Sequence, residues 1–397
     1  MTMDGSLHSQ KDHYRIGLNY WPIDTGIYWW RSFDQGSVEE DFSRIREAGV
    51  ETLRIFLLWE DFQPEPRKVS IQSIDRLVTV IEMGYEKGLR FVVTFFTGHM
   101  SGVNFLPPWM IEPDNGEFRF SIFSEGRKRK GKVLNFYSDR EIQKAQKLLL
   151  REVSEALKGH PALWAWDLGN EPSNLVLPNS KEEAERWLEE MVSELKKRGE
   201  SILVTLGLHQ EDLEEDRRMG PKEVAHWCDF LSIHAYSIYA PWTSDKMDES
   251  VIPFLGLLTW WLGSKEVLIE EVGIPSSNTF KGEMIVSEEE AYSYYERLLH
   301  SLSRYPFMGV FFWCYGDYSR ALWERPPLDG AIHERCFGVF REDRSPKPFL
   351  PLLSLLQEKK RGEEMRLDWI GIEPDEYFLN PKEHLSKLFW RFKEQED

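Results

Sequence analysis

Cysteine is scarce in this chain, which has only three among its 397 residues: Cys228, Cys314 and Cys336. Three is an odd number, and their spacing matches neither a disulfide framework nor a metal site. Unpaired cysteines fit a reducing compartment. The first 15 residues, MTMDGSLHSQKDHYR, also lack the apolar segment of a secretory signal. The sequence therefore predicts a cytoplasmic protein.

Long apolar runs and an excess of positive charge are missing too. No stretch of 18 apolar residues occurs, so the sequence predicts no membrane-spanning helix. There are 67 acidic and 49 basic residues, which gives a net charge of −18. Nucleic acids and anionic membranes attract basic surfaces, so neither is expected as a partner. Homo-oligomerisation is left open.

Cofactor motifs are also lacking. No glycine-rich phosphate turn follows the first predicted strand. The histidines do not have the H-E-x-x-H spacing of a zinc site. We therefore expect no cofactor, whether nucleotide, flavin or metal.

Aromatic side chains, by contrast, are abundant, with 16 Trp, 24 Phe and 14 Tyr. Many of them must belong to the core. Flat aromatic faces also stack on the apolar C–H faces of sugar rings, so this composition favours a carbohydrate enzyme.

Nearly continuous apolar runs alternate with predicted helices along the chain. Strands are predicted at 15–21, 51–59, 89–96, 162–168, 201–207, 228–236, 266–273 and 307–315. Helices are predicted from about Val38, with Ser37 as N-cap, and at 71–87, 139–158, 180–198, 247–262, 287–303 and 346–359. Continuous apolar strands are typical of parallel sheets that are buried on both faces. Eight strands with helices between most of them predict an α/β fold closed as a (β/α)8 TIM barrel. A doubly wound open sheet is the alternative, disfavoured by the missing glycine-rich turn.

Two segments do not fit this repeat. Residues 97–138 are rich in Gly, Pro and aromatics, which predicts a long loop insertion after the third strand. The end of the chain, WIGIEPDEYFLNPKEHLSKLFWRF, holds too many aromatic and leucine residues for a disordered tail. We expect residues 1–359 to form the barrel and residues 360–397 an ordered C-terminal extension packed on it.

Polar and aromatic residues recur at the C-terminal ends of the predicted strands, where active sites of such barrels lie. In chain order they are Arg54, Trp59, Glu60, His99, Asn104, Asn170, Glu171, His234, Tyr236, Glu270, Glu271 and Trp313. Two carboxylates facing each other across the barrel mouth, after strands four and seven, suit glycosidic bond hydrolysis. That reaction needs an acid at the leaving oxygen and a second carboxylate opposite it.

Two motifs resemble those of a known enzyme family. WDLGNEPSN (166–174) looks like the fourth-strand signature of retaining glycoside hydrolases of clan A, and VLIEEVGIP (267–275) resembles the seventh-strand nucleophile segment of glycoside hydrolase family 5. GLNYWP, FLLWEDFQPEP and FFTGHMSG are similar to a family 5 subgroup of β-mannosidases and cellulase-like enzymes. The insertion and the C-terminal tail are not shared by the general family.

The resemblance implies that Glu171 is the acid/base and Glu271 the nucleophile, with no cofactor. Chemistry suggests that Arg54 holds Glu271 ionised and that Asn170 binds the sugar 2-hydroxyl. Tyr236 can donate a hydrogen bond to the nucleophile, and His234 can bind a sugar hydroxyl. Trp313 can stack under the sugar ring at the cleavage site. The weaker candidates for hydroxyl recognition are Trp59, Glu60, His99 and Asn104. The role of Glu270 stays open.

The sequence favours a retaining, exo-acting β-mannosidase that acts on short oligosaccharides. An endo-acting β-mannanase or β-glucanase, or a β-glucosidase, is the alternative among enzymes. A non-catalytic sugar-binding barrel is the alternative of another class, disfavoured because binding alone does not need two opposed carboxylates. The sequence does not decide between mannose and glucose, nor the linkage.

Overall fold

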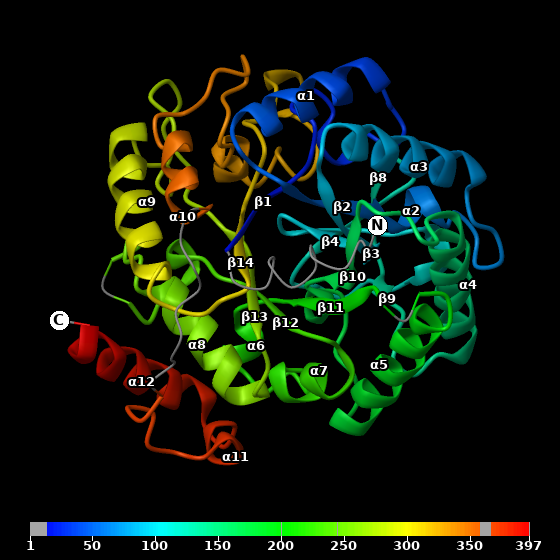
Figure 1. The fold of residues 1–397 in the computed structure, drawn as a ribbon. Coiled ribbons are helices and arrows are strands. Elements are labelled where there is room, and N and C mark those ends of the chain that lie inside the picture. The colour runs from blue at the N-terminus through cyan, green and yellow to red at the C-terminus, as the bar shows by residue number, and fades with distance from the viewer. Residues whose placement is uncertain (1–13, 200, 244, 358–366, 397) are drawn as a thin grey trace, which may run out of the picture.

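The structure is a computed structural model that describes residues 14–199, 201–243, 245–357 and 367–396. Eight parallel strands close into a barrel in the order β1–β2–β3–β10–β11–β12–β13–β14, and β14 pairs with β1 (Figure 1). The barrel strands are β1 (Arg15–Asn19), β2 (Thr52–Leu58), β3 (Arg90–Thr97), β10 (Leu163–Asn170), β11 (Leu203–Leu208), β12 (Leu231–His234), β13 (Val267–Val272) and β14 (Gly309–Phe312). The predicted (β/α)8 fold is confirmed.

At least one helix follows each barrel strand and packs on the outside of the barrel (Figure 1). These helices are α1 (Gln35–Glu47), α3 (Ile71–Glu86), α4 (Arg140–Ala156), α5 (Lys181–Lys196), α7 (Pro221–Trp227), α8 (Val251–Gly263), α9 (Glu288–Leu302) and the short α10 (Ser354–Gln357). Two further single turns, α2 (Trp59–Phe62) and α6 (Glu211–Glu214), lie in the loops after β2 and β11.

Three details differ from the sequence prediction. The N-cap of α1 is Asp34, whose carboxylate accepts from the backbone of Ser37, so Ser37 is the third residue inside the helix rather than its cap. Helix α7 was not predicted, because it has only seven residues and begins with Pro221 directly after Gly220. The helix expected at 346–359 is the 3-10 turn η7 (Leu350–Leu353) followed by α10. Residues 358 and 359 lie outside the described residues.

The insertion of residues 97–138 has strands of its own. β4 (His99–Met100), β5 (Val103–Phe105), β7 (Ser121–Ser124) and β8 (Arg127–Arg129) form a four-stranded sheet, while β6 (Ile111–Glu112) pairs with β9 (Lys132–Val133). The 3-10 turn η2 (Pro108–Met110) precedes β6. The buried Phe105 and Phe123 contact Tyr28, which follows β1. The insertion is therefore a folded subdomain on the mouth of the barrel rather than an irregular loop.

The C-terminal segment carries α11 (Pro374–Tyr377) and α12 (Pro381–Glu396), and α12 lies against α6 and α8 (Figure 1). Phe389 of α12 is fully buried and contacts Trp242 and Phe254. The proposed division of the chain at residue 359 stays a prediction, because residues 358–366 lie outside the described part.

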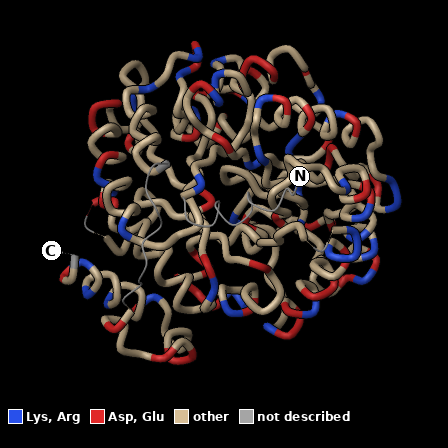
Figure 2. Tube along the Cα trace, viewed as in Figure 1, with Lys and Arg blue, Asp and Glu red and all other residues tan. Residues whose placement is uncertain are grey.

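Charged residues of both signs are interspersed along the outer helices (Figure 2). None of the described helices is long and apolar enough to cross a membrane.

Candidate active site

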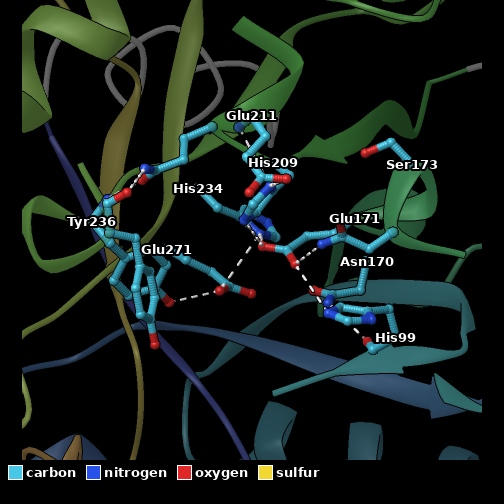
Figure 3. Close-up of polar contacts among 12 residues, drawn as sticks. His99, Asn170, Glu171, Ser173, His209, Glu211, His234, Tyr236 and Glu271 are labelled. Atoms are coloured by element: carbon cyan, nitrogen blue, oxygen red, sulfur yellow. Dashed lines mark hydrogen bonds and ion pairs between the residues drawn. The ribbon is translucent and has the colours of Figure 1, made fainter. Parts of the chain in front are cut away.

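A cavity of about 660 Å³ opens at the C-terminal ends of the barrel strands. It brings together residues that are far apart in the sequence, including His99, Asn170, Glu171, Tyr236, Glu271 and Trp313. Figure 3 shows the carboxylates of Glu171 and Glu271 pointing toward each other, with His234 beside both.

Glu171 directly follows β10 and has a left-handed backbone, with φ +47° and ψ +55°. Non-glycine residues rarely adopt this conformation, and such strain clusters at functional sites. The backbone N–H of Glu171 donates to the carbonyl of Gly207 at 3.0 Å, and Pro172 begins the 3-10 turn η3 (Pro172–Asn174). Its side chain accepts from Asn174 Nδ2 at 3.0 Å, and its Oε1 lies 2.8 Å from His234 Nδ1. Both the backbone and the carboxylate are thus held in place.

A register shift in β13 aims two consecutive carboxylates into the barrel. Ile269 is aligned with Ile233, but Glu271 is aligned with His234, so Glu270 is an extra residue. Such a bulge re-aims side chains, which would otherwise alternate between the two faces. Glu271 consequently lines the cavity, while Glu270 lies fully buried below it. The open question about Glu270 is settled in favour of the barrel interior.

Glu271 is held by one permanent cation and one phenol. Arg54 Nη1 donates to its Oε1 at 2.6 Å, and the Tyr236 hydroxyl donates to its Oε2 at 2.7 Å. Burial raises the pKa of Glu271, and the charge of Glu171 adds to this, whereas His234 and Arg54 lower it. The predicted contacts of Arg54 and Tyr236 with Glu271 are both present.

Arg54 is the centre of a buried charged layer beneath the cavity. Its guanidinium also contacts Asp167 at 2.8 Å and Glu270 at 3.6 Å, and it donates to Asn170 Oδ1 at 3.0 Å. Burial raises the pKa of Asp167 to about 6, and Glu270 adds to this. A Cβ on Gly207 would lie 2.9 Å from Arg54 Nη2, so the layer needs a glycine there.

Two histidines next to Glu171 titrate in opposite directions. Burial lowers the pKa of His99 to about 4, although Glu171 opposes the shift. Burial also disfavours the charged form of His234, but Glu271 and Glu171 outweigh it and raise its pKa to about 10. For Glu171 itself, burial raises the pKa, but His209, His234 and His99 together lower it below its ordinary value. These shifts favour a proton on His234 and a charge on Glu171.

The two carboxylates are close. One oxygen of Glu171, one of Glu271 and one nitrogen of His234 all lie within 4.8 Å of one another. Retaining glycosidases have carboxyl groups about 5–5.5 Å apart, whereas inverting enzymes need about 6.5–9.5 Å. The spacing is closer to the range of retaining enzymes than to that of inverting enzymes.

The same three side chains are also metal-binding types, and in the described part of the chain they form the one cluster of its kind. Arg54 already lies 2.6 Å from Glu271, and a second cation there would be repelled. The arrangement favours a sugar site over a metal site.

Three of the weaker candidates do not contact the cavity. Trp59 is fully buried in the core between Phe96 and Trp109, so it cannot stack on a sugar. Glu60 accepts from the backbone of Glu125 and lines a different surface cleft. Asn104 lies behind His99, whose Nδ1 is 2.7 Å from its Oδ1. The structure corrects these three predictions, because position at a strand end did not decide which way the side chains point.

Several cavity residues were missed by the sequence reasoning. His209 lies 3.8 Å from Glu171 and directly follows β11, so the rule of polar residues after strands would have found it. Glu211, Tyr239 and Glu334 also line the cavity. Glu334 lies more than 20 residues past β14, where no sequence signal marks it.

Comparisons with known proteins bear on the family and the fold. A glycoside hydrolase 42 family model, described as beta-galactosidase, matches residues 27–205, which is less than half of the chain. No curated protein matches the sequence.

Solved structures with a similar fold include three glycosidase-type proteins. A GH5_18 protein from Streptomyces cattleya in complex with GlcNAc is 21% identical, with a TM-score of 0.74 over 89% of this chain and 82% of that one. A variant GH5_18 protein from Bifidobacterium longum subsp. longum in complex with Manb1-4GlcNAc is 20% identical, with a TM-score of 0.74 over 88% and 80%. An exo-beta-1,4-mannosidase from an Opitutaceae bacterium is 22% identical, with a TM-score of 0.72 over 90% and 62%. At these identities the structures establish the fold. Together with the family match, they support a glycoside hydrolase of clan A.

Proposed function

We propose that this chain is a retaining β-glycosidase of the family 5 type, and specifically an exo-acting β-mannosidase. The observation that carries the proposal is the pair Glu171 and Glu271, whose oxygens approach within 4.8 Å across the cavity. Arg54 and Tyr236 support Glu271 as the nucleophile, and His234 supports Glu171 as the acid/base. Neighbouring folds whose names include an exo-mannosidase and a Manb1-4GlcNAc complex support the choice of sugar.

The acid proton belongs to the Glu171–His234 pair. His234 Nδ1 lies 2.8 Å from Glu171 Oε1, so transfer of a proton along this contact gives a protonated Glu171 and a neutral imidazole. Protonated Glu171 then protonates the glycosidic oxygen while Glu271 attacks the anomeric carbon. Ionised Glu171 next activates the water that releases the sugar from Glu271. Asn170 has one amide N–H engaged with the His99 carbonyl, which leaves its second N–H for the sugar 2-hydroxyl.

The folded insertion supports exo action. Its Ser101 donates to Glu334 at 3.0 Å, its Lys128 lies 3.3 Å from Asp329, and its Arg119 pairs with Glu211. These contacts join the insertion to the loops after β14 and β11, on two sides of the barrel mouth. A mouth walled in this way suits the end of a short oligosaccharide better than the middle of a polymer. We therefore propose an oligosaccharide as the substrate. The proposed mechanism uses no cofactor.

A β-galactosidase is the second candidate, favoured by the family-model match to residues 27–205. An endo-acting mannanase is a third and requires an open groove. The three cysteines are buried and unpaired, as a reducing compartment allows, so we keep the cytoplasm as the proposed location.

The test is hydrolysis of aryl β-mannoside, β-glucoside and β-galactoside and of polymeric mannan, by the wild type and by Glu271→Ala. We expect rapid cleavage of the mannoside, little action on polymer, and loss of activity in the variant. If the enzyme prefers the galactoside or mannan, the proposed substrate is wrong, but the assignment of Glu171 and Glu271 stands. Turnover of none of the four by wild type would favour a non-catalytic sugar-binding barrel.

A further inference from the structure

We propose that Glu334 holds a hydroxyl group of the terminal, non-reducing sugar. This inference rests on the proposed glycosidase function and extends it to a residue that neither the sequence motifs nor the catalytic pair includes.

The position of Glu334 follows from the strand order. β14 is four strands from β10 in either direction around the eight-stranded barrel, so it lies across the mouth from Glu171. Trp313 directly follows β14, and Glu334 lies in the 3-10 turn η6 (Ile332–Cys336) of the same loop. Glu171 must face the glycosidic oxygen. The ring carbons farthest from that oxygen therefore point toward Trp313 and Glu334.

Glu334 is fixed by several contacts in the cavity wall across from Glu171. Its side chain is 8% exposed, and its Oε2 accepts from the Trp313 indole and from Ser101 Oγ, each at 3.0 Å. Its Oε1 accepts from the Tyr239 hydroxyl at 3.3 Å, and His333 Nε2 lies 3.7 Å from the same oxygen, beyond hydrogen-bond distance. A carboxylate offers about four acceptor positions, and three are used here. Since Glu334 also lines the cavity, one acceptor position stays available to a sugar hydroxyl.

The hydrogen bond from Trp313 also lets Glu334 position the indole. In the proposed complex, the indole stacks on the sugar ring and the carboxylate accepts from a hydroxyl of the same ring. The hydrogen bond between them fixes these two contacts relative to each other. Ser101 joins this pair to the insertion.

Glu211 provides a matched control. It is also a carboxylate that lines the cavity, but it lies on the side of Glu171, 3.7 Å from His209. It is paired with Arg119 and Arg217, so its acceptor positions are occupied by cations. A substitution there should affect the leaving-group side of the substrate and not the terminal sugar.

The experiment measures kcat/KM for aryl β-mannoside and for its analogues that lack the hydroxyl at C3, C4 or C6, with wild type, Glu334→Gln and Glu211→Gln. In wild type, removal of the hydroxyl that Glu334 binds should reduce kcat/KM about 10- to 100-fold, as for a hydrogen bond to a charged group. In Glu334→Gln the same removal should cost less than about threefold, with KM raised more than kcat is lowered. Glu211→Gln should keep the wild-type discrimination.

The outcomes separate the two proposals. If wild type cleaves the mannoside and Glu334→Gln discriminates among the analogues as wild type does, the assignment of Glu334 is wrong and the proposed function stands. If wild type prefers another aryl glycoside, the same comparison is made with deoxy analogues of that sugar. If wild type cleaves none of them, the proposed function fails, and the assignment of Glu334 fails with it.

Discussion

The ends of β10 and β13 carry the two carboxylates that we propose as catalytic, and they differ in the basic side chains that surround them. Glu171 lies near His99, His209 and His234, at 3.9, 3.8 and 2.8 Å. Glu271 has His234 at 3.5 Å, but its nearest partner is Arg54 at 2.6 Å, which keeps its charge at every accessible pH. Histidines can give up a proton and arginine cannot. In the proposed mechanism, the β10 end thus suits a carboxylate that exchanges a proton, and the β13 end suits a carboxylate that stays ionised.

The largest effect should come from the β13 end. Glu271→Ala removes the nucleophile, and we expect activity to fall to background with every substrate, because no other group can form the covalent intermediate. Added azide should restore turnover and give the α-glycosyl azide, detectable by NMR. An active Glu271→Ala enzyme without azide would contradict the assignment.

A smaller and substrate-dependent effect is expected at β10. Glu171→Ala should reduce kcat/KM roughly 10²–10⁴-fold for poor leaving groups. The loss should shrink for dinitrophenyl glycosides, whose leaving group needs no protonation. Steady-state kinetics over a series of aryl leaving groups measures this. Equal losses in Glu171→Ala and Glu271→Ala across the series would remove the distinction between the two strand ends.

The contrast between a cavity tryptophan and a core tryptophan should be visible in KM. Trp313→Phe should raise KM about tenfold, because Trp313 lines the cavity and fixes Glu334. Trp59→Phe should leave KM near its wild-type value and lower the melting temperature, because Trp59 is core. A raised KM in Trp59→Phe alone would contradict the placement of both residues.

Protonation of His234 should also make the free energy of unfolding depend on pH. The pKa of His234 is raised to about 10 in the folded chain, against an ordinary value near 6.5. Because this pKa is raised on folding, protonated His234 stabilises the fold. Its contribution to stability is fully present below about pH 6.5 and is lost as the pH rises through 10. Between pH 7 and pH 10 the free energy of unfolding should fall more for wild type than for His234→Gln, by about 1.4 kcal/mol per unit of pKa difference. Denaturant titrations at both pH values measure this, and parallel curves would contradict it.

Much of this comparison could be predicted from the sequence. Continuous apolar strands and their spacing predicted the barrel, and the NEP and EEVG motifs indicated which strands carry Glu171 and Glu271. Side-chain direction could not be predicted. The bulge at Glu270 depends on pairing between strands, and Trp59 turns into the core because the chain enters α2 directly after β2. Glu334 reaches the cavity only because a loop folds back, a contact that no local pattern encodes.

The assignment of the nucleophile is the central claim, and covalent trapping tests it most directly. The wild type would be incubated with a 2-deoxy-2-fluoro-β-mannoside that carries an activated leaving group, digested, and sequenced by mass spectrometry. We expect one added fluorosugar on the peptide that contains residues 267–275, attached at Glu271. Attachment at Glu270 or Glu171, or turnover of ordinary aryl β-mannoside without any trapped adduct, would contradict the account.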